Sequence, residues 1–122
     1  MCLWAQSSVW DGVYTNEQAA RGQTAYGQNC ESCHGEKLDG GGQAPPLAGD
    51  EFLNSWNHTT LAELFERIQT DMPADKPNSL SKDTNADILA YILKTNKFPA
   101  GEKPIAAGDA LKNIRIEAQR KQ

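Results

Sequence analysis

The chain has 122 residues, a length that fits one domain and not two. Its net charge is −4 with both signs interspersed, which argues against a nucleic-acid-binding protein because such proteins usually present a basic face. No stretch is long and apolar enough to span a bilayer. Hydrophobic residues make up 39% of the chain and aromatic residues 7%, a modest supply for a small core that a large bound cofactor would complete.

The N-terminal end is unusual for a folded domain. Residues 1–6 are mostly apolar, lack a basic segment and run into two serines. We interpret them as the end of a secretory signal peptide, and an ordinary disordered N-terminus is the alternative. Cys2 is then either removed or a free thiol. Residues 1–8 are accordingly predicted to lie outside the folded domain.

Three long helices are predicted from capping residues and from apolar residues at helical spacing. Thr15 and Gln18 have the spacing of a capping box, in which two side chains bond the helix N-terminus reciprocally. Thr60 and Glu63 repeat this spacing before the second helix, and Ser81 precedes the third. The expected helices cover about 16–28, 61–69 and 82–95.

Two loops rich in glycine and proline separate these helices. The first, Gly35 to Gly49, is longer than most loops in compact domains, which indicates a functional loop or one that wraps around something. The second covers residues 70–79, and short helical turns are expected at 50–56. Gly22 inside the first helix costs about 1 kcal/mol relative to alanine, which indicates a close helix contact. The fold class is therefore predicted to be all-α.

The most informative motif is Cys30-Glu31-Ser32-Cys33-His34. C-x-x-C-H is the attachment signature of c-type haem. Two thiols at this spacing can reach the two vinyl groups on one edge of the porphyrin, and the histidine that follows lies beneath the iron. Neutral imidazole is a suitable ligand for that iron. The sequence thus predicts one haem c, bound covalently through Cys30 and Cys33 and ligated by His34.

Three other interpretations of this motif fit the sequence less well. A thioredoxin-like redox pair requires a βαβ setting, which the pattern does not contain. A structural zinc site requires four ligands, and the only other candidates are His58 and Cys2. A disulfide between Cys30 and Cys33 leaves the following histidine unexplained.

Met72 is the predicted sixth ligand of the iron. It is the only methionine besides Met1, and it lies in a loop beside Asp71, Pro73 and Asp75. A single methionine usually fills a core, but these neighbours are not typical of one. A thioether ligand would raise the reduction potential because it favours ferrous iron.

Two alternatives to this ligand stay open at the level of sequence. His58 could complete a bis-histidine site, although its position just before the Thr59-Thr60 cap predicts a surface residue. An open sixth site would permit gas or peroxide chemistry, but the sequence indicates no distal pocket for it.

Taken together, the order of these segments resembles a class I c-type cytochrome. A helix with Gly22 and Tyr26 precedes C-E-S-C-H, and A-P-P-L-A-G, D-M-P and a last helix with Tyr91 follow it, over about Thr15 to Phe98. The resemblance implies the cytochrome c fold, with three main helices and short helical turns wrapped around one haem. It also implies that the first and last helices cross closely at Gly22.

The same resemblance implies further site residues. The backbone carbonyl of Pro45 is expected to accept the Nδ1 proton of His34, which would orient the imidazole. Leu47 is expected to pack on the haem. Trp56 is expected beside a haem propionate as an N–H donor, and plain core packing is the alternative for this residue.

Residues 9–99 are thus predicted to form the cytochrome domain and residues 100–122 a C-terminal extension. The lead-in and the last helix are similar to bacterial cytochromes that accompany quinoprotein and other periplasmic dehydrogenases. This implies an electron carrier in the periplasm rather than an enzyme, in a respiratory or dehydrogenase chain. Its redox partners would be a dehydrogenase as donor and an oxidase or another cytochrome as acceptor. The alternative is a haem enzyme or a gas or redox sensor with a displaceable sixth ligand.

Overall fold

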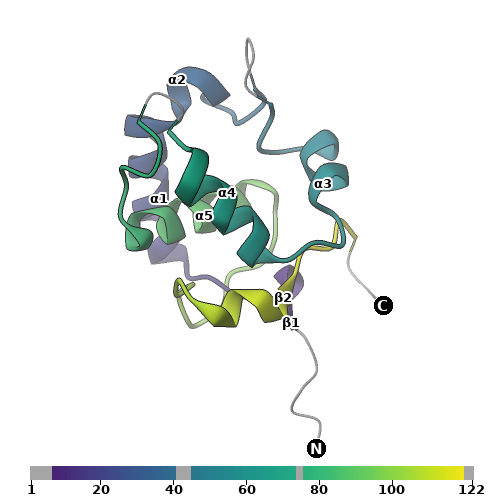
Figure 1. The fold of residues 1–122 in the computed structure, drawn as a ribbon. Helices are drawn as coiled ribbons and strands as arrows, with labels where there is room; N and C mark the ends of the chain where they lie inside the picture. The colour runs from purple at the N-terminus through teal and green to yellow at the C-terminus, as the bar shows by residue number, and fades with distance from the viewer. Residues whose placement is uncertain (1–6, 41–44, 74–75, 120–122) are drawn as a thin grey trace, which may run out of the picture.

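A computed structural model describes residues 7–40, 45–73 and 76–119 of the chain (Figure 1). The predicted signal-peptide remnant at residues 1–6, with Cys2, lies outside the described residues. The elements in chain order are β1 (Ser7–Ser8), η1 (Val9–Asp11), α1 (Asn16–Asn29), α2 (Glu31–His34), α3 (Asp50–Trp56), α4 (Leu61–Asp71), α5 (Lys82–Thr95), η2 (Asp109–Asn113) and β2 (Ile114–Arg115). The prediction of a mostly helical fold with three main helices and short helical turns is confirmed.

The predicted helix starts are confirmed. Ser81 accepts a hydrogen bond from the Thr84 backbone N–H at the start of α5, and Thr60 and Glu63 form a complete capping box at the start of α4. Helix α4 runs two residues further than predicted. It ends at Asp71 because Pro73 disfavours helical backbone at the preceding residue.

The first capping box is only half formed. Thr15 accepts from the backbone N–H of Gln18 at 3.1 Å as predicted. The Gln18 side chain turns instead to Ile105, donating to its carbonyl at 2.9 Å and accepting from its N–H at 2.7 Å. The prediction of a reciprocal box at this helix was therefore wrong, because a distant backbone segment satisfies both halves of this buried amide.

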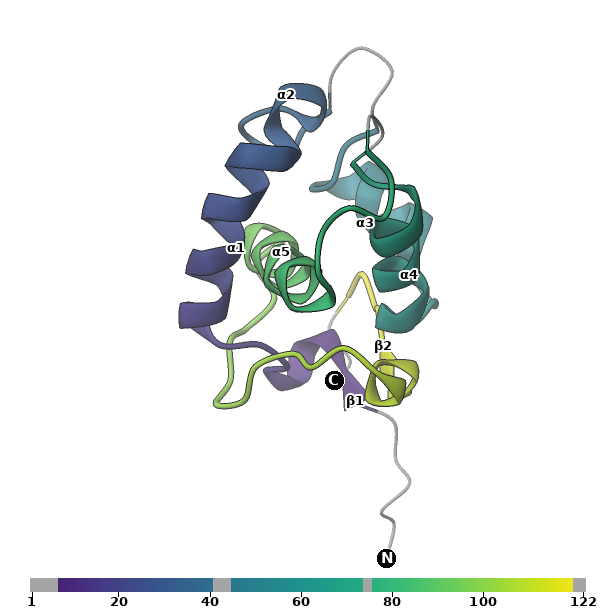
Figure 2. The ribbon, with the colours of Figure 1, turned by 60° about the vertical axis from the view of Figure 1, so that its left-hand side comes forward.

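Helices α1 and α5 cross and form the largest helix contact of the fold (Figure 2). Gly22 lies at the crossing, where a Cβ atom would stand only 1.8 Å from the backbone oxygen of Asp87. No residue with a side chain fits there without moving the two helices apart. Tyr26 and Tyr91 lie beside the crossing with ring centroids 5.4 Å apart, as the resemblance implied.

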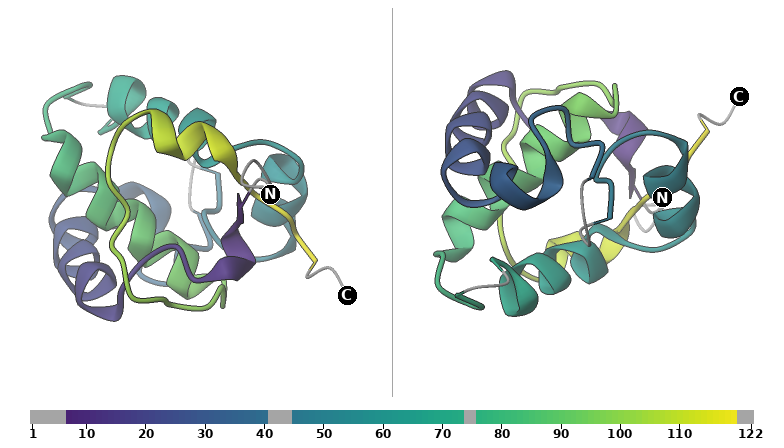
Figure 3. Two further views of the ribbon diagram at one scale, coloured as in Figure 1. Left: turned by 90° about the horizontal axis from the view of Figure 1, so that it is seen from below. Right: turned by 90° about the horizontal axis from the view of Figure 1, so that it is seen from above.

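The C-terminal segment, residues 100–119, packs against the rest of the described chain. Figure 3 shows it running across the lower face of the molecule, below α5. Strand β2 pairs in parallel with β1, and the Trp10 indole donates to the Glu117 carbonyl at 3.0 Å. Three of its apolar side chains are buried, namely Ile105, Leu111 and Ile116. No helix in the described ranges is long and apolar enough to cross a membrane.

Candidate haem site

The C-x-x-C-H motif directly follows α1, with Cys30 as the N-cap residue of the helical turn α2 and its other four residues forming that turn. The N–H groups of Cys33 and His34 both donate to the Cys30 carbonyl, at 3.2 and 2.9 Å. Cys30 is half-buried, Cys33 is exposed, and both are free thiols. Burial, reinforced by the neighbouring Cys33, raises the pKa of the Cys30 thiol to about 11. Both sulfur atoms thus come from a single turn, and that of Cys30 carries its proton at neutral pH.

Tyr26 ties this turn to the preceding helix. Its hydroxyl donates to the Gly35 carbonyl at 2.7 Å, immediately after the motif. Burial, with smaller contributions from nearby groups that include Cys30, raises the pKa of Tyr26 far above its ordinary value. The phenol therefore stays protonated and remains a hydrogen-bond donor.

His34 is 5% exposed and has a defined tautomer. Its Nδ1 lies 2.9 Å from the backbone oxygen of Pro45. A carbonyl oxygen can only accept, so Nδ1 carries a proton, and in the neutral imidazole Nε2 then presents a lone pair. Within the described residues Nε2 has no hydrogen-bond partner, which leaves it available to a metal.

The segment after the turn is anchored on both sides, which holds the Pro45 carbonyl in place. The Leu47 N–H donates to the Leu38 carbonyl at 2.7 Å, and Leu38 is fully buried. The Asn96 side chain donates to the Leu47 carbonyl and accepts from the Gly49 N–H, both at 3.0 Å. Leu47 itself is half-buried against the core.

Met72 and His58 lie beyond opposite ends of α4. Met72 follows the last residue of the helix, is half-buried, and its N–H closes the last turn on the Ile68 carbonyl at 3.2 Å. His58 precedes the first turn, is exposed, and is held by the C-terminal segment through a 2.8 Å bond to the Ile116 carbonyl. The eleven residues of the helix between them span about 16 Å. In Figures 1 and 2 the end of α4 that precedes Met72 points to the end of the molecule where α2 lies.

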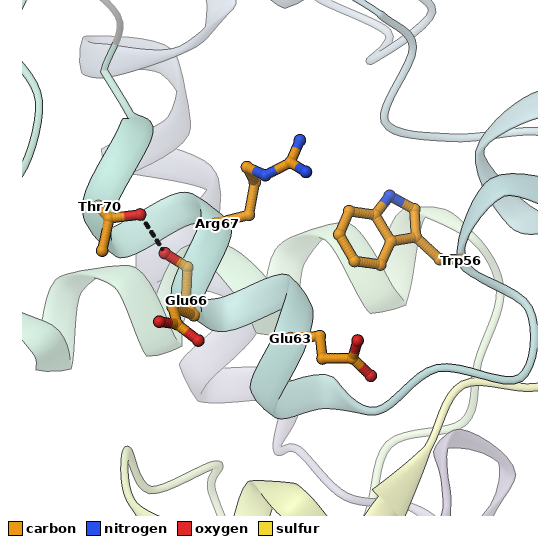
Figure 4. Close-up of a pocket in the computed structure, with 5 residues that line it drawn as sticks. All are labelled: Trp56, Glu63, Glu66, Arg67 and Thr70. Carbon is orange, nitrogen blue, oxygen red and sulfur yellow. Dashed lines mark hydrogen bonds between the residues drawn. The ribbon is translucent and has the colours of Figure 1, made fainter.

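Trp56 at the end of α3 faces Arg67 on α4 (Figure 4). The guanidinium carbon of Arg67 lies 5.9 Å from the centroid of the indole ring, and its Nε lies 3.3 Å from Asp71. A cavity of about 330 Å³ lies here. Its lining residues are Trp56, Glu63, Glu66, Arg67 and Thr70.

Two hydrogen-bond donors that line this cavity point to the same side of it. Figure 4 shows the indole nitrogen of Trp56 and the guanidinium of Arg67 on the same side, with the carboxylates of Glu63 and Glu66 turned away from it. Neither the indole N–H nor the outer guanidinium nitrogens have a hydrogen-bond partner in the described part of the chain. Two free donors that face one way suit a carboxylate. Sequence reasoning missed Arg67 because its spacing to Asp71 indicates only a surface ion pair.

This donor set fits haem c. It offers two thiols on one turn, an imidazole whose Nε2 is free, a thioether in a loop, and two donors suited to a propionate. For zinc the fit is poor, since no group of three or more His, Cys, Asp or Glu residues among those described could hold a metal ion.

Comparisons with known proteins identify the family of this chain. The family model described as cytochrome c oxidase, cbb3-type, subunit III matches residues 17–92. A curated relative, the cbb3-type cytochrome c oxidase subunit CcoP of Azospirillum brasilense, is 30% identical over an alignment of 94 residues, and the match covers 64% of this chain and 31% of that protein. The chain thus spans about a third of the length of this relative.

A solved structure shows the same fold. The sulfane dehydrogenase SoxCD from Paracoccus pantotrophus superposes with a TM-score of 0.51 and 22% identity, over 73% of this chain and 53% of that one. The resemblance to c-type cytochromes is confirmed. The chain belongs to the cytochrome c family described as cbb3-type cytochrome c oxidase subunit III, a family of haem-containing electron-transfer domains.

Proposed function

We propose that this chain binds one haem c covalently through Cys30 and Cys33, with His34 and Met72 as the axial ligands, and carries single electrons. The observation that carries the proposal is the 2.9 Å hydrogen bond from His34 Nδ1 to the Pro45 carbonyl. It fixes the tautomer and the orientation of an imidazole that directly follows two thiols at haem-attachment spacing.

The cofactor would supply a one-electron iron couple, and the chain's own residues would hold and tune it. Cys30 and Cys33 would anchor one edge of the macrocycle. The Pro45 carbonyl would make His34 a stronger ligand by accepting its Nδ1 proton. Leu47 would pack against the macrocycle and exclude water from the ligand. The Met72 thioether would favour the ferrous state.

Trp56 and Arg67 would hold the propionates in this scheme. The indole N–H and the guanidinium can both donate to a carboxylate, and the guanidinium supplies a positive charge that offsets the negative one. Asp71 holds Arg67 through its Nε, which leaves the outer nitrogens for a second partner.

With both axial positions filled by protein, the iron would change charge without binding a substrate. Electrons would enter and leave through an edge near the surface, and the exposure of Cys33 supports an edge at α2. The described residues around it expose three carboxylates, Glu31, Glu36 and Asp39, against one lysine, Lys37. The partner face is therefore expected to be neutral or basic.

The proposed partners are redox proteins, with a dehydrogenase as donor and an oxidase or another cytochrome as acceptor. The similarity to an oxidase subunit supports the second of these. The proposed place of action is the periplasm, because covalent haem attachment takes place outside the bacterial cytoplasm.

Carbon monoxide discriminates this proposal from a haem enzyme or gas sensor. The holoprotein, reduced at neutral pH, is expected to keep its spectrum under one atmosphere of the gas, because the thioether occupies the sixth position. A reversible redox titration with a one-electron slope completes the test. Rapid, stoichiometric carbon monoxide binding would move the assignment to an enzyme or sensor with a displaceable ligand.

A further inference from the structure

A chain of amide hydrogen bonds links α5 and α4 to the loop that carries Met72. The Asn85 side-chain Nδ2 donates to Gln69 Oε1 at 2.7 Å. Gln69 Nε2 donates in turn to Asn78 Oδ1 at 3.0 Å and to the Leu80 carbonyl at 3.3 Å. Met72 begins this loop at the end of α4, and residues 76–80 close it before α5.

The Leu80 carbonyl fixes the direction of this network. A carbonyl can only accept, so Gln69 must present its Nε2 to the loop and its Oε1 to α5. Asn85 must then present Nδ2 to Gln69, and its own Oδ1 faces the other way. That Oδ1 is buried and has no partner among the residues the structure describes. Asn85 therefore acts on the loop through Gln69. It holds the Gln69 amide in the orientation in which Nε2 can donate to Asn78 and Leu80.

Asparagine at position 85 lowers the stability of the fold relative to an apolar residue. Its side chain is 0% exposed, and its neighbours on α5, among them Ala86, Ile88 and Leu89, are apolar and buried. Burying an amide oxygen without a partner lowers stability, and an apolar side chain of similar shape would avoid that cost. What the asparagine adds is the single hydrogen bond that orients Gln69.

Gln69 holds the loop at Asn78, where the backbone turns. Asn78 adopts a left-handed conformation with φ of 62°, which asparagine tolerates better than most residues. Its Oδ1 accepts from Gln69, and Leu80 is held two residues later. Residues 76–80 of the loop are thereby linked to α4 through Gln69 and, through Asn85, to α5.

We propose that Asn85 and Gln69 are positioning residues for Met72, which keep its loop closed so that the thioether stays on the iron. This inference rests on the proposed axial ligation by Met72. Neither residue touches the metal. Their effect is on how often the loop opens.

Imidazole displacement in the oxidised holoprotein measures that opening. Imidazole enters only after the thioether leaves, so the limiting rate at high imidazole reports the opening of the loop. Asn85→Leu and Gln69→Leu each remove one link of the network. Both are expected to raise the limiting rate about two- to tenfold, the range that corresponds to one ordinary hydrogen bond.

Gln18→Leu is the matched control. Gln18 is also a buried amide with two hydrogen bonds, but its partner is Ile105 in the C-terminal segment. It is expected to lower the denaturant midpoint, because the Ile105 N–H and carbonyl lose their partner, while leaving the imidazole rate unchanged. The surface variant Asn78→Gly accommodates the left-handed backbone and removes the whole side chain, including the Oδ1 acceptor. It extends the test to a variant that does not disturb the core.

The outcomes separate this inference from the proposed function. If the unaltered protein lacks the sulfur-to-iron charge-transfer band, axial ligation by Met72 fails and the network has no ligand to position. If the band is present and the Asn85, Gln69 and Asn78 variants exchange at the unaltered rate, the inference is wrong. It is equally wrong if Gln18→Leu accelerates exchange as much as they do.

Discussion

Replacing Cys30 and Cys33 together with alanine is expected to abolish haem that survives denaturing electrophoresis. Without two thioether bonds, only the axial ligands and packing would retain the cofactor, and a denaturant removes both. Haem staining of the denatured chain is expected to fall from one haem per chain to background. Production with the c-type maturation machinery is required for both proteins.

Glu31→Ala is the matched control for this pair. Glu31 lies inside the same turn and is exposed, and its side chain would bind neither the macrocycle nor the iron. This variant is expected to retain all of its haem. The double variant is also expected to lose most of its folded structure, because the cofactor supplies part of a small core. Persistent haem on the denatured double variant would contradict covalent attachment at these cysteines.

Replacing Met72 with alanine is expected to leave haem attached and to open the sixth position. The oxidised spectrum is expected to become high-spin, and the reduced protein to bind carbon monoxide. The reduction potential is expected to fall by on the order of 0.1 V, a modest part of the ~0.8 V range that axial ligands span. The fall follows because a thioether favours ferrous iron.

His58→Ala tests the rival ligand in the same assays. His58 is exposed and held by the C-terminal segment, so this variant is expected to keep an unaltered spectrum and potential. Bis-histidine ligation would be indicated by the opposite pair of results, in which the Met72 variant stays six-coordinate and the His58 variant becomes high-spin.

Local features of the fold could be predicted from the sequence because neighbouring residues determine them. Ser81 and Thr60 mark the starts of two helices through hydrogen bonds that reach only three residues along the chain. Gly22 predicted a close helix contact because a glycine inside a helix lowers helix stability, and it is best explained where a neighbouring helix leaves no room for a side chain. The bond expected between His34 and Pro45 followed from family resemblance and not from any rule of spacing.

Contacts between separate elements of the fold could not be predicted in this way. Gln18 was expected to cap its own helix, but its partner Ile105 lies 87 residues further along the chain. Trp56 and Arg67 come together only once α3 and α4 are folded. The Asn85 network depends on a helix and a loop whose mutual position no local pattern specifies. Such contacts form between separate elements of the fold, so they are visible only in the folded chain.

The most direct test of axial ligation by His34 and Met72 is an optical spectrum of the holoprotein, oxidised and reduced. We expect a low-spin c-type spectrum in both states, with the weak sulfur-to-iron charge-transfer band in the oxidised form. A high-spin oxidised spectrum, or a low-spin spectrum without that band, would contradict ligation by Met72 and the electron-carrier function built on it.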